Sequence, residues 1–149
     1  MSLNLKEKDK YKYIDEGSGD VLLLLHGLFG ALSNWEGVVN SFSKNYRVII
    51  PMLPIYDMPL REAGLGGLVK FLSGFVELME LGQMNLIGNS LGGHVGLLYT
   101  LDYPDKVKKL VLTGSSGLFE NSMGGSFPKR GSYDYVKERV GYTFYDPSV

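Results

Sequence analysis

The chain has 149 residues, with 15 basic and 16 acidic side chains, two histidines and no cysteine, so its net charge is close to −1. This balance argues against a nucleic-acid-binding protein, in which a surplus of basic residues gathers on one face. The apolar fraction of 44% and the charged fraction of 21% are typical of one packed globular domain and not of a disordered chain. The lack of cysteine excludes disulfides, thiolate metal sites and a cysteine nucleophile within this chain.

No stretch of this sequence resembles a membrane span or a signal peptide. The longest aliphatic run, Val21–Leu25, is far shorter than the roughly 18 residues that a span needs. The segment Met1–Asp15 is charged and lacks the apolar region of a signal peptide. We therefore expect a cytoplasmic location with no membrane partner. Two isolated histidines without suitable carboxylate spacing predict no metal site, and no cofactor motif is present, so we expect no cofactor.

The first part of the chain predicts two strands and a helix. Lys10–Asp15 alternates charged and apolar residues, which predicts an edge strand with one face in water. Val21–Leu25 is continuously apolar between turn residues, which is typical of a strand buried on both faces. Ser33 and Glu36 have the spacing of a capping box, and we expect a helix from Asn34 to about Phe42.

The middle of the chain continues this alternation. Tyr46–Ile50 predicts a second buried strand, and the three prolines of Pro51–Pro59 predict a loop. Apolar residues then recur at helical spacing, which predicts a helix from about Leu65 to Leu81. Gly82 follows this helix and is the predicted C-terminal cap.

The last part predicts two more strands around a helix. Met84–Ile87 reads as the third buried strand, Ser90–Tyr103 as a helix and Val107–Thr113 as the fourth strand. Gly114–Gly131 is rich in glycine and serine and predicts a long loop. Ser132–Phe144 has a partly helical, amphipathic pattern.

Apolar strands that alternate with helices predict an α/β fold, with a mostly parallel sheet covered by helices on both faces. In such sheets the loops at the carboxyl ends of the strands carry the ligand site. Aliphatic residues become sparse at about Leu118, where glycine, serine and tyrosine take over. We therefore expect a core over residues 1–117 and a second segment over residues 118–149.

The segment Gly88–Gly92 is a G-x-S-x-G pentapeptide that lies between a predicted strand and a predicted helix. A strand that turns sharply into a helix exposes the central serine, Ser90, at the top of the sheet. The flanking glycines allow the strand end and the helix start to approach closely. The backbone N–H of Leu91 then lies at the helix N-terminus, where positive partial charge favours an oxyanion. A glycine-rich turn with an incidental serine is the simpler alternative.

A second glycine-rich segment, His26–Gly30, directly follows the first buried strand. Acyl transfer needs two N–H donors that point at the developing oxyanion. The N–H of Leu28 is our first choice for the second donor, and the N–H of Phe29 is the next. The alternative is an ordinary glycine loop that a histidine stabilises, and we expect His26 to shape the loop by a hydrogen bond.

Three segments together resemble the α/β-hydrolase fold family: Leu25–Gly30, Gly88–His94 and Tyr103–Val107. The resemblance extends over about Lys10–Leu118 and forms the N-terminal half of the fold. The G-N-S-x-G-G form is similar to the esterase and meta-cleavage-product (carbon–carbon bond) hydrolase branch. The loop Pro51–Pro59 departs from the pattern, because many relatives have an acidic, glycine-containing stretch there.

The resemblance implies a serine hydrolase with Ser90 as the nucleophile and the N–H groups of Leu28 and Leu91 as the oxyanion hole. It also implies that the segment from about Leu118 begins a cap over the active site. Relatives place the triad acid and histidine after the cap, so we expect both of them beyond Val149. The remainder of the same protein is then a partner that this chain needs, and we expect the chain alone to be inactive.

The histidines and carboxylates of this chain are poor candidates for the missing groups. His94 follows the nucleophile by four residues in the same predicted helix, and His26 belongs to the oxyanion loop. Asp102 and Asp105 lie at the far end of the helix, well away from Ser90. The carboxylates of the expected cap, Asp134, Glu138 and Asp146, are interpreted as surface charges.

Two functions remain open from the sequence. The first is a serine hydrolase that acts on a small-molecule substrate, by default a carboxylic ester, with cleavage of a carbon–carbon bond beside a ketone as the variant. The second is a non-catalytic protein that uses the same fold to bind a small apolar ligand, because the triad partners of Ser90 are missing. The sequence predicts neither the substrate's identity nor the oligomeric state.

Overall fold

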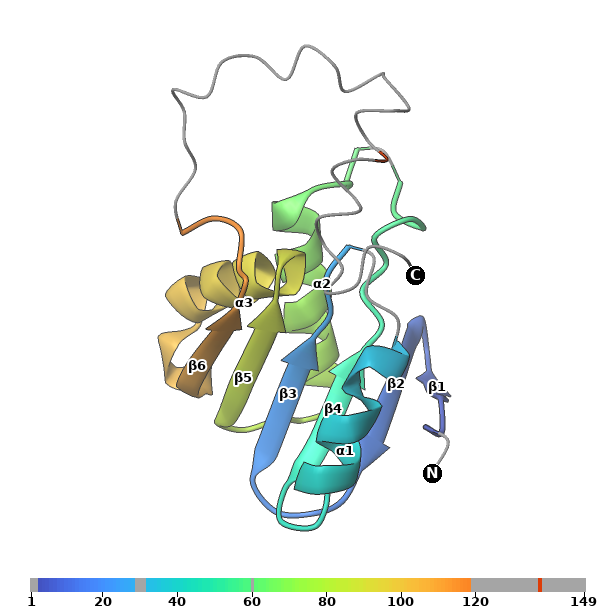
Figure 1. Ribbon diagram of the computed structural model, residues 1–149. Coiled ribbons are helices and arrows are strands. Elements are labelled where there is room, and N and C mark those ends of the chain that lie inside the picture. Colours follow the sequence, from blue (N-terminus) through green and yellow to red (C-terminus); the bar gives the residue numbers. More distant parts are fainter. Residues whose placement is uncertain (1–2, 29–31, 60, 119–136, 138–149) are drawn as a thin grey trace. The chain divides into compact units, whose positions relative to one another are not determined.

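The computed structural model describes residues 3–28, 32–59, 61–118 and 137. Six strands in these residues form one sheet in the order β1-β2-β4-β3-β5-β6 (Figure 1). Their bounds are β1 Lys6–Lys8, β2 Tyr11–Glu16, β3 Val21–Leu25, β4 Arg47–Pro51, β5 Met84–Asn89 and β6 Val107–Thr113. The chain divides into two compact units, Met1–Phe119 and Glu120–Val149, and the sheet belongs to the first. The predicted helix Ser132–Phe144 lies outside the described residues except for Lys137.

The sheet is mostly parallel, as the sequence predicts. β3 pairs in parallel with β4 and β5, and β5 pairs in parallel with β6. β1 and β2 are antiparallel and extend the sheet beyond β4. The carboxyl ends of β3, β4, β5 and β6 therefore meet at one edge of the sheet, where the candidate site lies.

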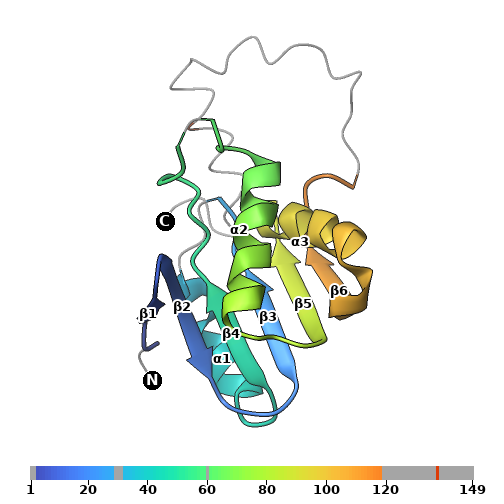
Figure 2. The same ribbon diagram turned by 180° about the vertical axis from the view of Figure 1, so that it is seen from behind.

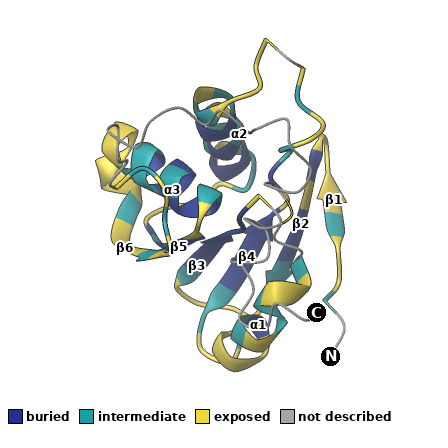
Figure 3. Ribbon diagram, turned by 45° about the horizontal axis from the view of Figure 1, so that its top comes forward, coloured by how far each residue is buried: buried dark blue, intermediate teal, exposed yellow. Residues whose placement is uncertain are grey.

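Helices cover both faces of the sheet. Helix α1 (Glu36–Phe42) lies on one face, and helices α2 (Leu65–Leu78) and α3 (Leu91–Asp102) lie on the other (Figures 1 and 2). Successive residues of β3 point to opposite faces. Leu22 and Leu24 therefore belong to the core cluster on the α1 side, whereas Leu23 and Leu25 belong to the larger cluster under α2 and α3. This double burial, visible on β3 and β4 in Figure 3, explains why the central strands are continuously apolar.

The structure corrects two expectations about the strands. The strand β2 is not the edge of the sheet, because β1 pairs with it and covers it. The segment Lys6–Lys8 is charged and only three residues long, so it carries no pattern that predicts a strand. The strand β4 includes Pro51, which pairs with Tyr13 in the last position of the strand. A proline is tolerated there because it closes the strand and interrupts no central hydrogen bond.

The ends of two helices also differ from prediction. α1 begins at Glu36 after a 3₁₀ turn, Leu32–Trp35, and the side chain of its N-cap residue, Trp35, makes no capping hydrogen bond. The prediction that Ser33 is the N-cap of this helix is therefore wrong, since Ser33 lies inside the 3₁₀ turn. α2 ends at Leu78, and Gly82 is not its cap. Glu80 instead takes the left-handed conformation, with a φ of 51°.

Candidate active site

Ser90 lies between β5 and α3 and has a backbone conformation that is rare for a serine. Its φ is 52° and its ψ is −118°, and its side chain is exposed. Its N–H donates to the carbonyl oxygen of Thr113 at 3.0 Å, and its own carbonyl oxygen accepts from the N–H groups of Gly93 at 3.0 Å, His94 at 3.2 Å and Ser116 at 3.4 Å. The end of β6 and the first turn of α3 thus hold the strand-to-helix turn that the G-x-S-x-G pattern predicts.

The glycines around Ser90 are required by close backbone approach. A Cβ added to Gly88 would lie 2.5 Å from the carbonyl oxygen of Gly92. A Cβ on Gly92 would collide with the carbonyl oxygens of Leu25 and His26 at the end of β3. A Cβ on Gly96 would lie 2.5 Å from Cδ2 of Leu86 in β5. These contacts confirm the sequence prediction that the glycines bring the helix close to the strands.

Leu91 is the first residue of α3. The first N–H groups of a helix have no acceptor within the helix, and they carry the positive end of its dipole. The Leu91 N–H therefore lies next to the serine at an end of the helix that favours negative charge. This is the position in which the sequence predicts the first oxyanion donor.

The segment that follows β3 lies directly beside Ser90. A Cβ added to Gly27 would be 3.1 Å from Cβ of Ser90 and 3.4 Å from the carbonyl oxygen of Asn89. Leu28, the next residue, has an exposed side chain. The structure therefore places Gly27, the residue before Leu28, next to Ser90, although the two residues are far apart in the sequence. Phe29, the second choice for the donor, lies outside the described residues.

His26 is buried and uses both ring nitrogens in hydrogen bonds to the backbone. The N–H of Leu53 donates to Nε2 at 2.9 Å, and Nδ1 lies 2.9 Å from the carbonyl oxygen of Gly27. Neither nitrogen is free to take a proton from Ser90, so His26 is not a candidate for the base. The hydrogen bond to Gly27 confirms the prediction that His26 shapes the loop.

The loop after β4, whose contacts the sequence left open, packs against this segment. The N–H of Leu53 holds His26, and the hydroxyl of Tyr56 donates to the carbonyl oxygen of Leu28 at 2.8 Å. Sequence reasoning missed both contacts. The departure from the family pattern at Pro51–Pro59 marked the right segment, but no residue pattern in it predicts a hydrogen bond to Leu28.

Three of the other groups considered for the triad lie in the described residues. His94 is half-buried on α3, and its Nδ1 lies 3.4 Å from Oγ of Ser116. Asp102 ends α3, and Asp105 lies in the following 3₁₀ turn, with both side chains exposed. Asp134, Glu138 and Asp146 lie outside the described residues. No described group of three or more histidine, aspartate or glutamate residues could hold a metal ion.

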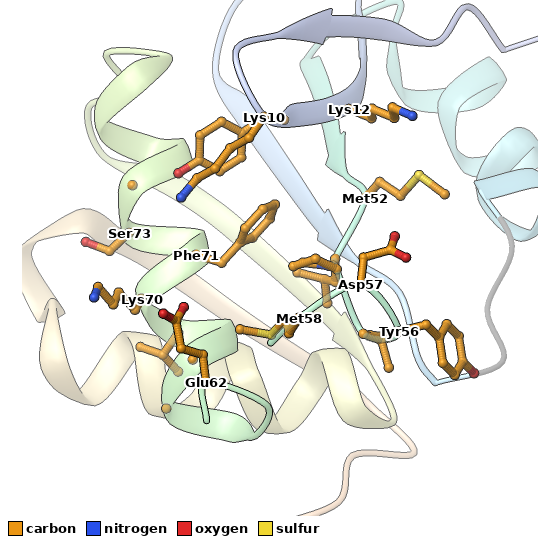
Figure 4. Close-up of a pocket in the computed structure, with 18 of the residues that line it drawn as sticks. Lys10, Lys12, Met52, Tyr56, Asp57, Met58, Glu62, Lys70, Phe71 and Ser73 are labelled. Carbon is orange, nitrogen blue, oxygen red and sulfur yellow. The ribbon is translucent and has the colours of Figure 1, made fainter. Parts of the chain in front are cut away.

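A cavity of about 1270 Å³ opens beside the same loops (Figure 4). It extends between the loop after β4 and helix α2, and His26 and Leu28 line it. Its apolar lining includes Met52, Met58 and Phe71, whereas Ser90 is not among the described residues that line it. The candidate oxyanion loop therefore lies beside both the serine and a cavity whose lining also includes charged side chains, among them Asp57, Glu62 and Lys70. Among the described residues, no helix has the length and apolarity needed to cross a membrane.

This chain is similar in sequence to two bacterial hydrolases. It is 30% identical over 145 residues to 2-hydroxy-6-oxo-2,4-heptadienoate hydrolase from Pseudomonas putida, which covers 91% of this chain and 52% of that protein. It is 32% identical over 111 residues to 2-hydroxymuconate semialdehyde hydrolase from a Pseudomonas species, which covers 70% of this chain and 39% of that protein. These names confirm the expected likeness to the meta-cleavage-product hydrolase branch.

A solved structure and a family model agree with these relatives. MGS-MChE2, an alpha/beta hydrolase enzyme from the metagenome of sediments of the Mar Chica lagoon in Morocco, has a TM-score of 0.75 and is 45% identical. The match covers 78% of this chain and 54% of that chain, so this chain spans about half the length of such relatives. The model of the alpha/beta hydrolase fold matches residues 20–139. The chain therefore belongs to the α/β-hydrolase fold family.

Proposed function

We propose that the protein is a serine hydrolase in which Ser90 attacks a carbonyl carbon. The N–H groups of Leu91 and Leu28 then stabilise the oxygen that becomes negative. The observation that carries this proposal is the conformation of Ser90, which is exposed at a φ of 52° between a strand and a helix. A non-glycine residue keeps such a conformation only where its surroundings enforce it, and such residues cluster at active sites.

The base and the acid of the triad come, in this proposal, from the remainder of the same protein. His26 has both ring nitrogens engaged, and His94 faces Ser116. In the α/β-hydrolase fold, the acid and the histidine follow the serine in the chain. The proposed partners of this chain are therefore the remainder of the protein and a small-molecule substrate. We propose that the protein acts in the cytoplasm and needs no cofactor.

The proposed substrate is a small carboxylic ester. Attack by Oγ of Ser90 forms an acyl-enzyme and releases the alcohol, which takes a proton from the histidine, and water then releases the acid. The names of the Pseudomonas relatives point to a second substrate class, a ketone with an adjacent carbon–carbon bond. In the cleavage of that carbon–carbon bond, the leaving group is a carbon atom, and this carbon takes the proton from the histidine. Activity on p-nitrophenyl acetate compared with activity on 2-hydroxy-6-oxo-2,4-heptadienoate decides between the two classes.

A fluorophosphonate probe tests the nucleophile in the full-length protein. We expect the probe to label the Ser90 peptide, and Ser90→Ala to abolish labelling and to lower hydrolysis by at least about 1,000-fold. Ser41→Ala is the matched control, because Ser41 is an exposed serine of α1 on the other face of the sheet. Labelling that persists in Ser90→Ala would contradict the proposal, whereas a parent protein that is not labelled would favour a protein that only binds its ligand.

A further inference from the structure

The oxyanion loop is held by a segment that the proposed function does not use. Leu28 lies in the loop after β3, and its neighbours in space come from the loop after β4. Two hydrogen bonds join the loops, from the N–H of Leu53 to Nε2 of His26 and from the hydroxyl of Tyr56 to the carbonyl oxygen of Leu28. In Figure 4 the ring of Tyr56 lies beside the ribbon that leads out of β3.

The hydrogen bond from Leu53 determines which nitrogen of the His26 ring carries the proton. A backbone N–H can only donate, so Nε2 accepts from Leu53 and the neutral ring carries its proton on Nδ1. That proton is donated to the carbonyl oxygen of Gly27, 2.9 Å away. The described peptide bonds are trans, so the N–H of Leu28 points in the opposite direction from this carbonyl. His26 thereby orients the peptide unit on the N-terminal side of Leu28.

Tyr56 acts in the same way on the C-terminal side of Leu28. Its hydroxyl holds the carbonyl oxygen of Leu28 at 2.8 Å, so the second peptide unit is oriented as well. With the peptide units on both sides held, the two backbone dihedrals of Leu28 are fixed. We propose that Tyr56 is a positioning residue, which keeps the Leu28 N–H oriented as an oxyanion donor beside Ser90. This inference rests on the proposed function.

Side-chain packing does not provide this orientation. The side chain of Leu28 is 41% exposed and that of Tyr56 is 74% exposed, and Gly27 has no side chain. Oxyanion donors stabilise a transition state only when they are oriented before the reaction, since reorientation during the reaction would cost part of the gain. The Tyr56 hydroxyl holds the carbonyl oxygen of Leu28 and so orients the Leu28 N–H before the reaction. The same exposure means that removal of the hydroxyl leaves the core intact.

Tyr56→Phe in the full-length protein tests the inference, with Tyr46→Phe as the matched control. Tyr46 precedes β4 at the opposite end of the strand from the loop that carries Tyr56. We expect Tyr56→Phe to lower kcat for ester hydrolysis by about two- to ten-fold, the effect of one hydrogen bond. KM and the unfolding midpoint should match those of the control. The affinity for a trifluoromethyl ketone, which forms an oxyanion on Ser90, should fall by the same factor.

A value of kcat for Tyr56→Phe equal to that of Tyr46→Phe would overturn the inference. A rise in KM alone would overturn it too, because it would show that the hydroxyl contacts the substrate and does not act through Leu28. Ser90→Ala separates this failure from that of the proposed function. If Ser90→Ala abolishes activity and Tyr56→Phe does not change it, only the positioning role is wrong.

Discussion

Ser90 combines an exposed hydroxyl with a left-handed backbone, and both depend on its neighbours. A non-glycine residue in such a conformation costs about 1–3 kcal/mol. The cost is offset by four hydrogen bonds, since Thr113 accepts from the N–H of Ser90 and the N–H groups of Gly93, His94 and Ser116 donate to its carbonyl oxygen. The strain is thus concentrated in the residue that is proposed to react.

Gly27 is the residue through which the oxyanion loop meets Ser90. In Gly27→Ala the new Cβ would lie 3.1 Å from Cβ of Ser90, so the loop or the serine must move by a few tenths of an ångström. Small misplacements of reacting groups are costly, and we expect labelling of Ser90 by a fluorophosphonate to slow by about ten-fold. The labelling rate, measured by mass spectrometry, checks this.

Gly37→Ala provides the control for the previous substitution. Gly37 lies in α1, and no atom would lie within 4 Å of an added Cβ. This change should leave labelling unaltered and should stabilise the helix by at most about 1 kcal/mol. Equal labelling rates in the two alanine variants would show that Gly27 does not set the geometry at Ser90.

The sequence predicted those parts of the site that follow from local backbone geometry. The close approach at Gly88 and Gly92 and the exposure of Ser90 all follow from a strand that turns directly into a helix. The bond from Tyr56 to Leu28 spans 28 residues and depends on how two loops pack. No periodicity or motif encodes such a contact, so the structure was needed to find it.

At the scale of elements, the end of α2 shows how a helix ends without a glycine. The N–H of Leu81 donates to the carbonyl of Val76 at 3.0 Å, and the N–H of Glu80 donates to that of Glu77 at 3.0 Å. These bonds form a Schellman motif with Glu80 in the left-handed position, where glycine is usual. We expect Glu80→Gly to raise the free energy of unfolding by about 0.5–1 kcal/mol, measured by urea denaturation.

Gly82→Ala tests whether Gly82 has any part in ending α2. Gly82 was expected to be the cap, but it lies beyond the motif, and an added Cβ there would have no atom within 4 Å. Its substitution should change the stability by less than about 0.5 kcal/mol. A destabilisation larger than this, or no gain in Glu80→Gly, would mean that Gly82 ends the helix after all.

The strands differ in how well the sequence predicts them, because the residues of some strands form a clear local pattern and those of others do not. β3 and β6 have the predicted bounds, Val21–Leu25 and Val107–Thr113. β3 is apolar throughout because both of its faces are covered, and turn residues bound it on each side. β1 was missed because Lys6–Lys8 is charged and only its pairing with β2 makes it a strand. Tertiary pairing overrides local pattern in such short segments.

At the scale of the whole molecule, the larger core cluster contains two buried tyrosines whose ionisation opposes folding. Burial, followed by the negative charges of Tyr103 and Glu77, raises the pKa of Tyr99 to about 12. Burial likewise raises the pKa of Tyr11. Tyr99 is 1% exposed, so its phenolate has no access to water in the folded protein. The neutral phenol is therefore the form that the folded state requires.

This shift predicts how stability depends on pH. An unfolded tyrosine loses its proton near pH 10, whereas folded Tyr99 keeps its proton until about pH 12. Between these values the folded state binds more protons than the unfolded state, so stability falls as the pH rises. For Tyr99 the full loss is about 2–3 kcal/mol, and it is absent below pH 10. Urea denaturation of the purified protein at pH 9 and at pH 11 measures the loss.

Other groups also titrate above pH 9, so the contribution of Tyr99 is isolated by comparison with Tyr99→Phe. Phenylalanine keeps the ring in the core between α3 and the sheet but has no proton to lose. We expect the drop in unfolding free energy between pH 9 and pH 11 to be smaller in Tyr99→Phe than in the parent protein, by about 1 kcal/mol or more. An equal drop in the two proteins would show that Tyr99 titrates normally, and hence that α3 does not keep water from its hydroxyl.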